Sequence, residues 1–143
     1  MIASFVFFFK IWFIRAMTKI LIIGMGGFIG AVLRYMIGGY VQHLTKSIGF
    51  PYGTLFVNIL GCFIIGVLFY LSSAHAVFSS QSRSLIFIGI LGSFTTFSTF
   101  GNETMNLLRD SESFLAYANI VAHIVLGIGA VWLGRVSGFL IWR

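Results

Sequence analysis

The residues between Gly92 and Gly101 are the ones whose types and spacing most clearly favour chemistry. Five hydroxyl side chains lie here in the middle of a long apolar run: Ser93, Thr95, Thr96, Ser98 and Thr99. Gly92 lowers helix propensity and hydroxyls can replace backbone hydrogen-bond partners, so we expect a helix break between Gly92 and Thr95. Carbonyls freed at such a break can hold a cation, and half-helix ends can face ions. The alternative is a straight helix that packs through its Ser and Thr side chains.

Phenylalanines recur every three residues in the same stretch, at Phe94, Phe97 and Phe100. On a helix, Phe97 and Phe100 share a face. Aromatic residues at this spacing more often pack than bind ligands. The edge of a phenyl ring is nevertheless positive, so ring edges could line a narrow path for a small anion. The hydroxyls of Ser98 and Thr99 would then add hydrogen-bond donors.

A second polar face is expected on the preceding helix. Thr54, Asn58 and Cys62 follow one another at intervals of four residues and therefore lie on one helical face. An Asn inside a membrane span is costly unless it finds a partner. The amide of Asn58 can bond a neighbouring helix or donate to an anion, and the pattern leaves both roles open.

Charged residues are few within the apolar runs. Apart from Glu103 no carboxylate lies in any of them, which excludes a carboxylate relay of the kind that proton-coupled cation transport needs. Arg34 lies about 22 Å along the helix from Lys19 and can snorkel to the far interface, either as an anchor or to draw anions. His123 is a lone polar residue on an apolar helix, and we expect it to pack with a partner.

The elements that must position these residues are membrane-spanning helices. The chain has 143 residues, of which 59% are hydrophobic and 8% charged, whereas a soluble domain carries about 25% charged residues. The single Cys62 excludes a disulfide framework, three scattered His exclude a spaced metal cluster, and the scattered basic residues do not suggest a nucleic-acid partner. We predict an all-α integral membrane protein with four transmembrane helices, over residues 20–41, 54–74, 84–108 and 114–134.

The first 16 residues are expected to stand apart from this domain. The apolar run within them is interrupted by Lys10 and is shorter than the roughly 20 residues that a span requires. Met17 would be an ordinary start, so residues 1–16 form an N-terminal extension that is either a start-site artefact or a short interfacial helix. Residues 17–143 form a single four-helix membrane domain.

The basic residues give only a weak preference for one orientation in the membrane. The side that holds both termini would carry six of them, Lys10, Arg15, Lys19, Arg83, Arg135 and Arg143, and the other side Arg34, Lys46 and Arg109. Without the first 16 residues the count is four against three. Such a chain can insert both ways, and two oppositely inserted copies could pair about an axis in the membrane plane.

Three ordered motifs resemble the fluoride channels of the Fluc/CrcB type. GGFIGAVLRY at residues 26–35 resembles the family's double-glycine to Arg-Tyr motif, and PYGTLFVNILG at residues 51–61 resembles its Gly-Thr-Leu and Val-Asn signature. GSFTTFSTF at residues 92–100, followed by Glu103, is close to its most specific motif, and VWLG at residues 131–134 also fits.

This resemblance implies a broken third helix and an antiparallel, dual-topology homodimer in the inner (plasma) membrane. It implies a channel rather than an enzyme, one that lets cytoplasmic fluoride leave passively and so gives fluoride resistance. A structural sodium ion would lie at the dimer interface, held by the backbone carbonyls of Gly92 and Thr95.

The resemblance also implies roles for side chains along the pore. Phe97 and Phe100 would line it, Asn58 would be an amide donor, and Thr54 and Ser98 would supply hydroxyls, with Arg34 and Glu103 in electrostatic or structural roles. The chain departs from the family at His123, near where a hydroxyl is usual, and at Cys62, where Ser is common.

Two other functions remain open. A proton-coupled small-molecule exporter would need a titratable carboxylate in its path, and only Glu103 is available. A membrane scaffold would use its glycines to pack helices and would pass no ions.

Overall fold

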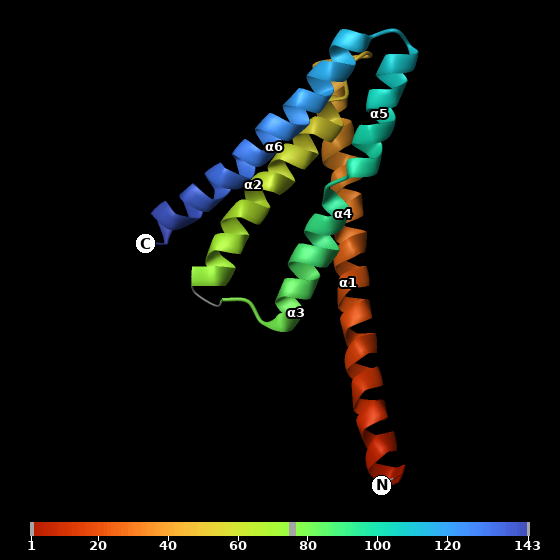
Figure 1. Ribbon diagram of the computed structural model, residues 1–143, viewed down its shortest axis with the longest axis vertical. Coiled ribbons are helices and arrows are strands. Elements are labelled where there is room, and N and C mark those ends of the chain that lie inside the picture. Colours follow the sequence, from red (N-terminus) through yellow and green to blue (C-terminus); the bar gives the residue numbers. More distant parts are fainter. Residues whose placement is uncertain (1, 75–76, 143) are drawn as a thin grey trace.

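The computed structural model describes residues 2–74 and 77–142 of the chain. Four helical stretches are long and apolar enough to cross a membrane: Trp12–Thr45, Tyr52–Ala74, Ser80–Arg109 and Ser113–Ile141. They run alternately up and down, so that the two short connections 46–51 and 110–112 lie at the same end of the molecule (Figure 1). The expected all-α architecture with four spans is confirmed.

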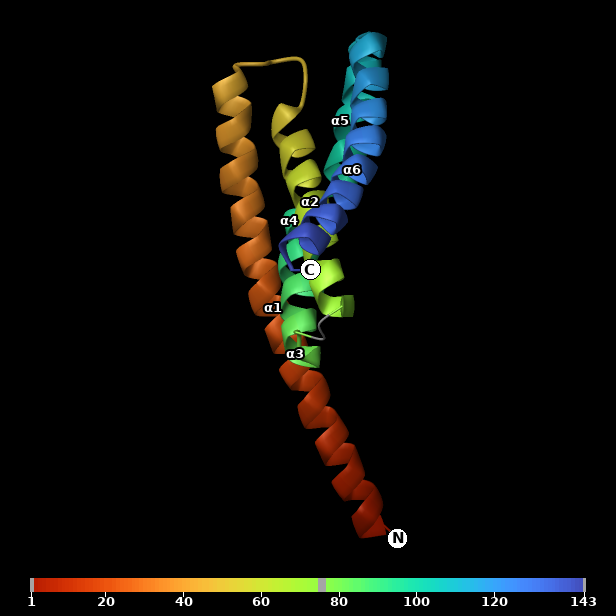
Figure 2. The same ribbon diagram turned by 90° about the vertical axis from the view of Figure 1, so that its left-hand side faces the viewer.

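Helix α1 (Ile2–Thr45) is longer than the expected span of residues 20–41. Neither Gly nor Pro occurs between Ile2 and Ile23, so nothing in the sequence interrupts the helix. Its 44 residues measure about 66 Å, roughly twice the hydrocarbon thickness of a bilayer. Residues 2–16 are therefore continuous with the rest of α1 rather than a separate helix, and they project beyond the other helices (Figures 1 and 2).

The third span is built from several pieces. Helix α3 (Ser80–Arg83), the π-helical segment η1 (Ser84–Leu91) and helix α4 (Gly92–Phe94) follow one another directly, and α5 (Phe97–Arg109) begins after an interruption. Thr95 and Thr96 have extended backbones, with φ −88° and ψ 156° for Thr95 and φ −150° and ψ 119° for Thr96. Gly92 itself stays helical. The break thus falls on the two β-branched residues, which favour extended conformations, rather than on the glycine.

Glycines lie where the helices cross most closely. A Cβ on Gly30 of α1 would collide with the backbone carbonyl of Ile90 in η1. Helix α2 (Tyr52–Ala74) and helix α6 (Ser113–Ile141) meet in the same way, because a Cβ on Gly66 or on Gly134 would collide with the backbone of the other helix. Small residues allow this close approach, which drives helix association in lipid. The two crossings fix α1 against the first half of the third span and α2 against α6.

Substitution of Gly30 should therefore separate α1 from η1. We expect Gly30→Ala to lower the free energy of unfolding by about 1–3 kcal/mol, the usual cost of overpacking. Gly24→Ala is the matched control, since no atom lies within 4 Å of a Cβ built there. Thermal unfolding of both purified variants in detergent measures the difference. Equal midpoints for the two variants would contradict the close crossing.

Candidate functional site

The break in the third span is stabilised by its own threonines. The Thr96 hydroxyl accepts a hydrogen bond from the Thr99 N–H at 3.2 Å and so caps the first turn of α5. On the other side, the N–H and the hydroxyl of Thr95 both donate to the Leu91 carbonyl, each at 3.1 Å. Thr96 is only 8% exposed, so the break lies inside the protein. The hydroxyl cluster therefore satisfies part of the interrupted backbone.

Asn58 of α2 binds the extended backbone of Thr96 at two points. Its Oδ1 accepts from the Thr96 N–H at 2.8 Å, and its Nδ2 donates to the Thr96 carbonyl at 3.0 Å. Gly61, on the next turn of α2, lets Thr95 approach, because a Cβ there would collide with the Thr95 methyl group. The sequence left open whether Asn58 bonds another helix. It does, and its partner is the backbone of the break.

These hydrogen bonds release two carbonyl groups from the helical pattern. In a regular helix the Gly92 carbonyl would accept from the Thr96 N–H, and the Thr95 carbonyl from the Thr99 N–H. The Thr96 N–H donates to Asn58 instead, and the Thr99 N–H donates to the Thr96 hydroxyl. Carbonyls freed in this way are the groups that coordinate Na⁺ in unwound membrane helices. Gly92 and Thr95 could therefore hold a cation through their backbones.

A pocket of about 370 Å³ lies beside the break. Helices α2, α4, α5 and α6, the segment η1 and the break itself supply its walls. Among its lining residues are Asn58, Cys62, Gly92, Thr95, Thr96, Phe97, Phe100 and His123. Asn58, Phe97 and Phe100 are thus brought together with the two residues whose carbonyls are freed. No charged side chain is among the lining residues.

Aromatic rings form one side of this pocket. The ring centroids of Phe97 and Phe100 are 5.4 Å apart, and that of Phe100 is 4.3 Å from the imidazole of His123. Phe97 is 82% exposed, so its ring is held by few contacts within the chain. His123, for which the sequence indicated only packing, lies against a ring of the pocket.

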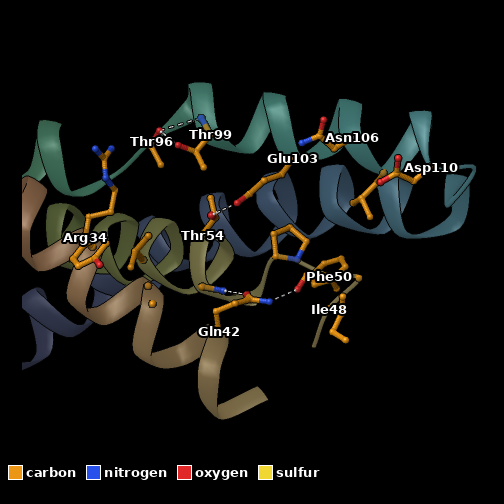
Figure 3. Close-up of a pocket in the computed structure, with 18 residues that line it drawn as sticks. Arg34, Gln42, Ile48, Phe50, Thr54, Thr96, Thr99, Glu103, Asn106 and Asp110 are labelled. Atoms are coloured by element: carbon orange, nitrogen blue, oxygen red, sulfur yellow. Dashed lines mark hydrogen bonds between the residues drawn. The ribbon is translucent and has the colours of Figure 1, made fainter. Parts of the chain in front are cut away.

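A second pocket, of about 520 Å³, lies on the side of the break toward the 46–51 connection (Figure 3). Arg34, Thr54, Thr96 and Glu103 are among its lining residues. The Thr54 hydroxyl donates to the Glu103 carboxylate at 2.6 Å, whereas the other Glu103 oxygen has no partner among the described residues. The only ion pair in the described ranges joins Arg109 to Asp110, which leaves the Arg34 guanidinium without a carboxylate partner there.

The residues singled out from the sequence thus divide between two pockets that share Thr96. Asn58, Phe97 and Phe100 line the smaller pocket, whereas Arg34, Thr54 and Glu103 line the larger one. Ser98 is exposed on α5 and lines neither, although its hydroxyl lies 3.2 Å from that of Thr96.

Sequence reasoning missed the central position of Thr96. Its amide and carbonyl both bond Asn58, and its hydroxyl caps α5. The available signal was the costly Asn58 itself, which had to find a polar partner in another span.

Comparison with known proteins identifies relatives over most of the chain. A family profile described as "CrcB-like protein, Camphor Resistance (CrcB)" matches residues 21–135. A protein of Methanosarcina acetivorans named "Fluoride-specific ion channel FluC 1" is 50% identical over 121 residues, which are 85% of this chain and 91% of the relative.

Two further relatives carry similar names. "Fluoride-specific ion channel FluC 3" of Methanosarcina barkeri is 46% identical over 119 residues, 83% of this chain and 89% of the relative. "Fluoride-specific ion channel FluC" of Methanococcus maripaludis is 41% identical over 126 residues, 88% of this chain and 100% of the relative.

Proposed function

The chain belongs to the CrcB family, and we propose that it is a fluoride channel, not an enzyme, in which the anion moves passively down its own gradient. The pocket beside the break carries this proposal. Fluoride is small and strongly hydrated, so it must exchange its water for hydrogen-bond donors. Asn58, with its amide N–H donors, and Phe97 and Phe100, whose ring edges are positive, line this pocket, and its lining residues include no carboxylate to repel an anion.

The larger pocket would be the approach to this path. Arg34 lies in it without a carboxylate partner among the described residues, and an unpaired cation raises the local concentration of anions. Thr96 lines both pockets and so lies between the approach and the ring-lined section. Thr54 and Ser98 would add hydroxyl donors along the route. Selectivity for fluoride over chloride would come from a narrow path and the geometry of its donors.

Passive conduction accounts for fluoride export from a cell. Neutral HF crosses the membrane, dissociates in the less acid cytoplasm and leaves an anion that cannot return through lipid. A channel in the inner (plasma) membrane lets this anion flow out, and the cell becomes fluoride resistant.

Expression in a bacterium that lacks its own fluoride exporter tests this role. We expect growth at fluoride concentrations that stop the parent strain, with a lower intracellular fluoride content. The same arrest with and without the protein, once the protein is detected in the membrane fraction, would contradict it.

The assembly that we propose is a homodimer of two antiparallel copies. It is supported by the distribution of basic residues over the two ends, which is four against three without the first 16 residues and so allows insertion in both orientations. A tag at the C-terminus should then be reachable from both faces of sealed vesicles. A tag that is reachable from one face alone would contradict dual topology.

A structural sodium ion would lie where the breaks of the two copies meet. The carbonyls of Gly92 and Thr95 fit this ion, because their helical donors bond elsewhere and carbonyl oxygens suit Na⁺. When bound, the ion would offset the partial negative charge of these carbonyl oxygens. In this chain the Asn58 amide and the Thr96 hydroxyl keep the carbonyls free for it.

Removal of sodium should therefore impair the protein slowly. We expect prolonged exchange of Na⁺ for a large organic cation to reduce both fluoride flux and the dimer fraction, because the carbonyls lose their shared partner. Flux assays and size-exclusion chromatography over several days measure the two effects, with re-addition of Na⁺ as the control. If fluoride flux and the dimer fraction are both unchanged after exhaustive exchange of Na⁺, the protein has no structural sodium ion.

A further inference from the structure

The imidazole of His123 has one defined hydrogen bond. Its Nδ1 lies 3.0 Å from the backbone carbonyl oxygen of Asn119, one turn earlier on α6. A carbonyl oxygen only accepts hydrogen bonds, so Nδ1 must carry the hydrogen. In the neutral imidazole the other nitrogen, Nε2, then holds a lone pair and can only accept. The backbone of α6 therefore fixes the tautomer.

The side chain that carries this lone pair lies in the wall of the pocket that we assign to the anion path. His123 lines the smaller pocket together with Asn58 and Phe97, and the Phe100 ring lies 4.3 Å from the imidazole, centroid to centroid. Nε2 is buried and has no hydrogen-bond partner among the described residues. In the neutral state this wall of the pocket thus holds a buried, unpartnered acceptor, which offers no hydrogen bond to fluoride. Protonation turns the same atom into a donor and adds a positive charge.

We propose that His123 is a proton-controlled fluoride ligand, which binds the anion through Nε2–H in its imidazolium form and withholds that bond when neutral. This proposal rests on the fluoride-channel function given above. A charge-assisted hydrogen bond to an anion is stronger than a neutral one. Fluoride flux should accordingly increase as the pH falls, because acid supplies the proton that creates the donor.

Few other titratable groups face His123 from the helices packed against α6. Helix α2 contributes Cys62, which lines the same pocket, and α5 contributes Glu103, one turn beyond Phe100. One Glu103 oxygen accepts from Thr54, and this carboxylate lines the larger pocket instead. In the described part of α6 itself, the nearest titratable side chains are Tyr117 and Arg135, more than one turn away on either side. Substitution of His123 alone therefore tests whether the pH dependence of fluoride flux comes from His123 or from one of these other groups.

The test is the pH dependence of fluoride efflux from liposomes that contain the purified full-length protein. We expect flux to rise about tenfold between about pH 8 and about pH 5.5, the range in which imidazole titrates, if one charge-assisted hydrogen bond is gained. His123→Gln keeps a polar amide that does not titrate, so the ratio of flux at the two pH values should fall to about one. Protein-free liposomes at each pH correct for diffusion of HF.

His43→Gln is the matched control, since His43 is exposed in the last turn of α1 and lines neither pocket. It should keep the pH dependence of the parent. His123→Thr repeats the test if His123→Gln fails to fold. A pH dependence that survives in either folded His123 variant, or that is absent from the parent, would overturn the proposal. No fluoride flux from the parent at any pH would instead reject the fluoride-channel function itself.

Discussion

Asn58→Asp is expected to reduce fluoride flux by about 100-fold, which corresponds to about 3 kcal/mol, the upper end of the cost of leaving a buried polar group unsatisfied. The substitution removes the Nδ2 group that donates to the Thr96 carbonyl and sets a carboxylate oxygen against that carbonyl. It also places a negative charge in the pocket through which the anion would pass. Efflux from proteoliposomes measures the flux, and size-exclusion chromatography checks that the variant elutes like the parent, as the proposed dimer requires.

Asn102→Asp makes the same chemical change in a matched setting. Asn102 is exposed on α5 and lines neither pocket, so the variant should conduct like the parent. If Asn58→Asp conducts like the parent, Asn58 does not line the anion path, and the break does not need the two hydrogen bonds that Asn58 makes to Thr96. An equal loss of fluoride flux in both variants would mean that any added negative charge in a span reduces the flux, and not a charge at Asn58 in particular.

Phe97→Ile should reduce fluoride flux by about two- to tenfold, since the positive ring edge is the interaction lost and aromatic contacts contribute about 0.5–1.5 kcal/mol. The side chain is 82% exposed within the chain, so the change should cost little folding stability. Flux and thermal unfolding, measured on the same preparation, separate the two effects. A large fall in the unfolding midpoint with unchanged flux would contradict a pore role.

Phe114→Ile is the control for this variant. Phe114 is also 82% exposed, it lies in the first turn of α6, and it lines neither pocket. The same apolar area is removed, but no ring edge is taken from the proposed path. Only Phe97→Ile should slow fluoride.

The spans could be predicted from the sequence because each depends on a local property. A run of about 20 apolar residues satisfies its backbone as a helix wherever it lies in the membrane. The break was predictable for a related reason, since glycine and hydroxyls within such a run weaken the helix. Its exact position was not, because the choice between Gly92 and the two threonines depends on Asn58, which lies on another helix.

The partners of the site residues could not be read from spacing. Thr54 bonds Glu103 and Asn58 bonds Thr96 across separations of 49 and 38 residues, which follow from how α2 packs against α5. The division into two pockets has the same origin, since Thr54 and Asn58 share a helical face but bond different parts of the third span, Glu103 in α5 and Thr96 in the break. His123 was assigned to packing because a lone histidine carries no pattern, and only the geometry of α6 fixes its tautomer.

The most direct measurement is fluoride efflux from proteoliposomes of the purified parent protein, read with a fluoride electrode and paired with chloride efflux from the same preparation. Rapid fluoride release with little chloride release, in the absence of any proton gradient, is the predicted result. Comparable release of both anions would contradict selective conduction by the ring-lined pocket. No release of either, from protein shown to be folded and dimeric in sodium, would contradict the channel and leave the broken span as a packing device.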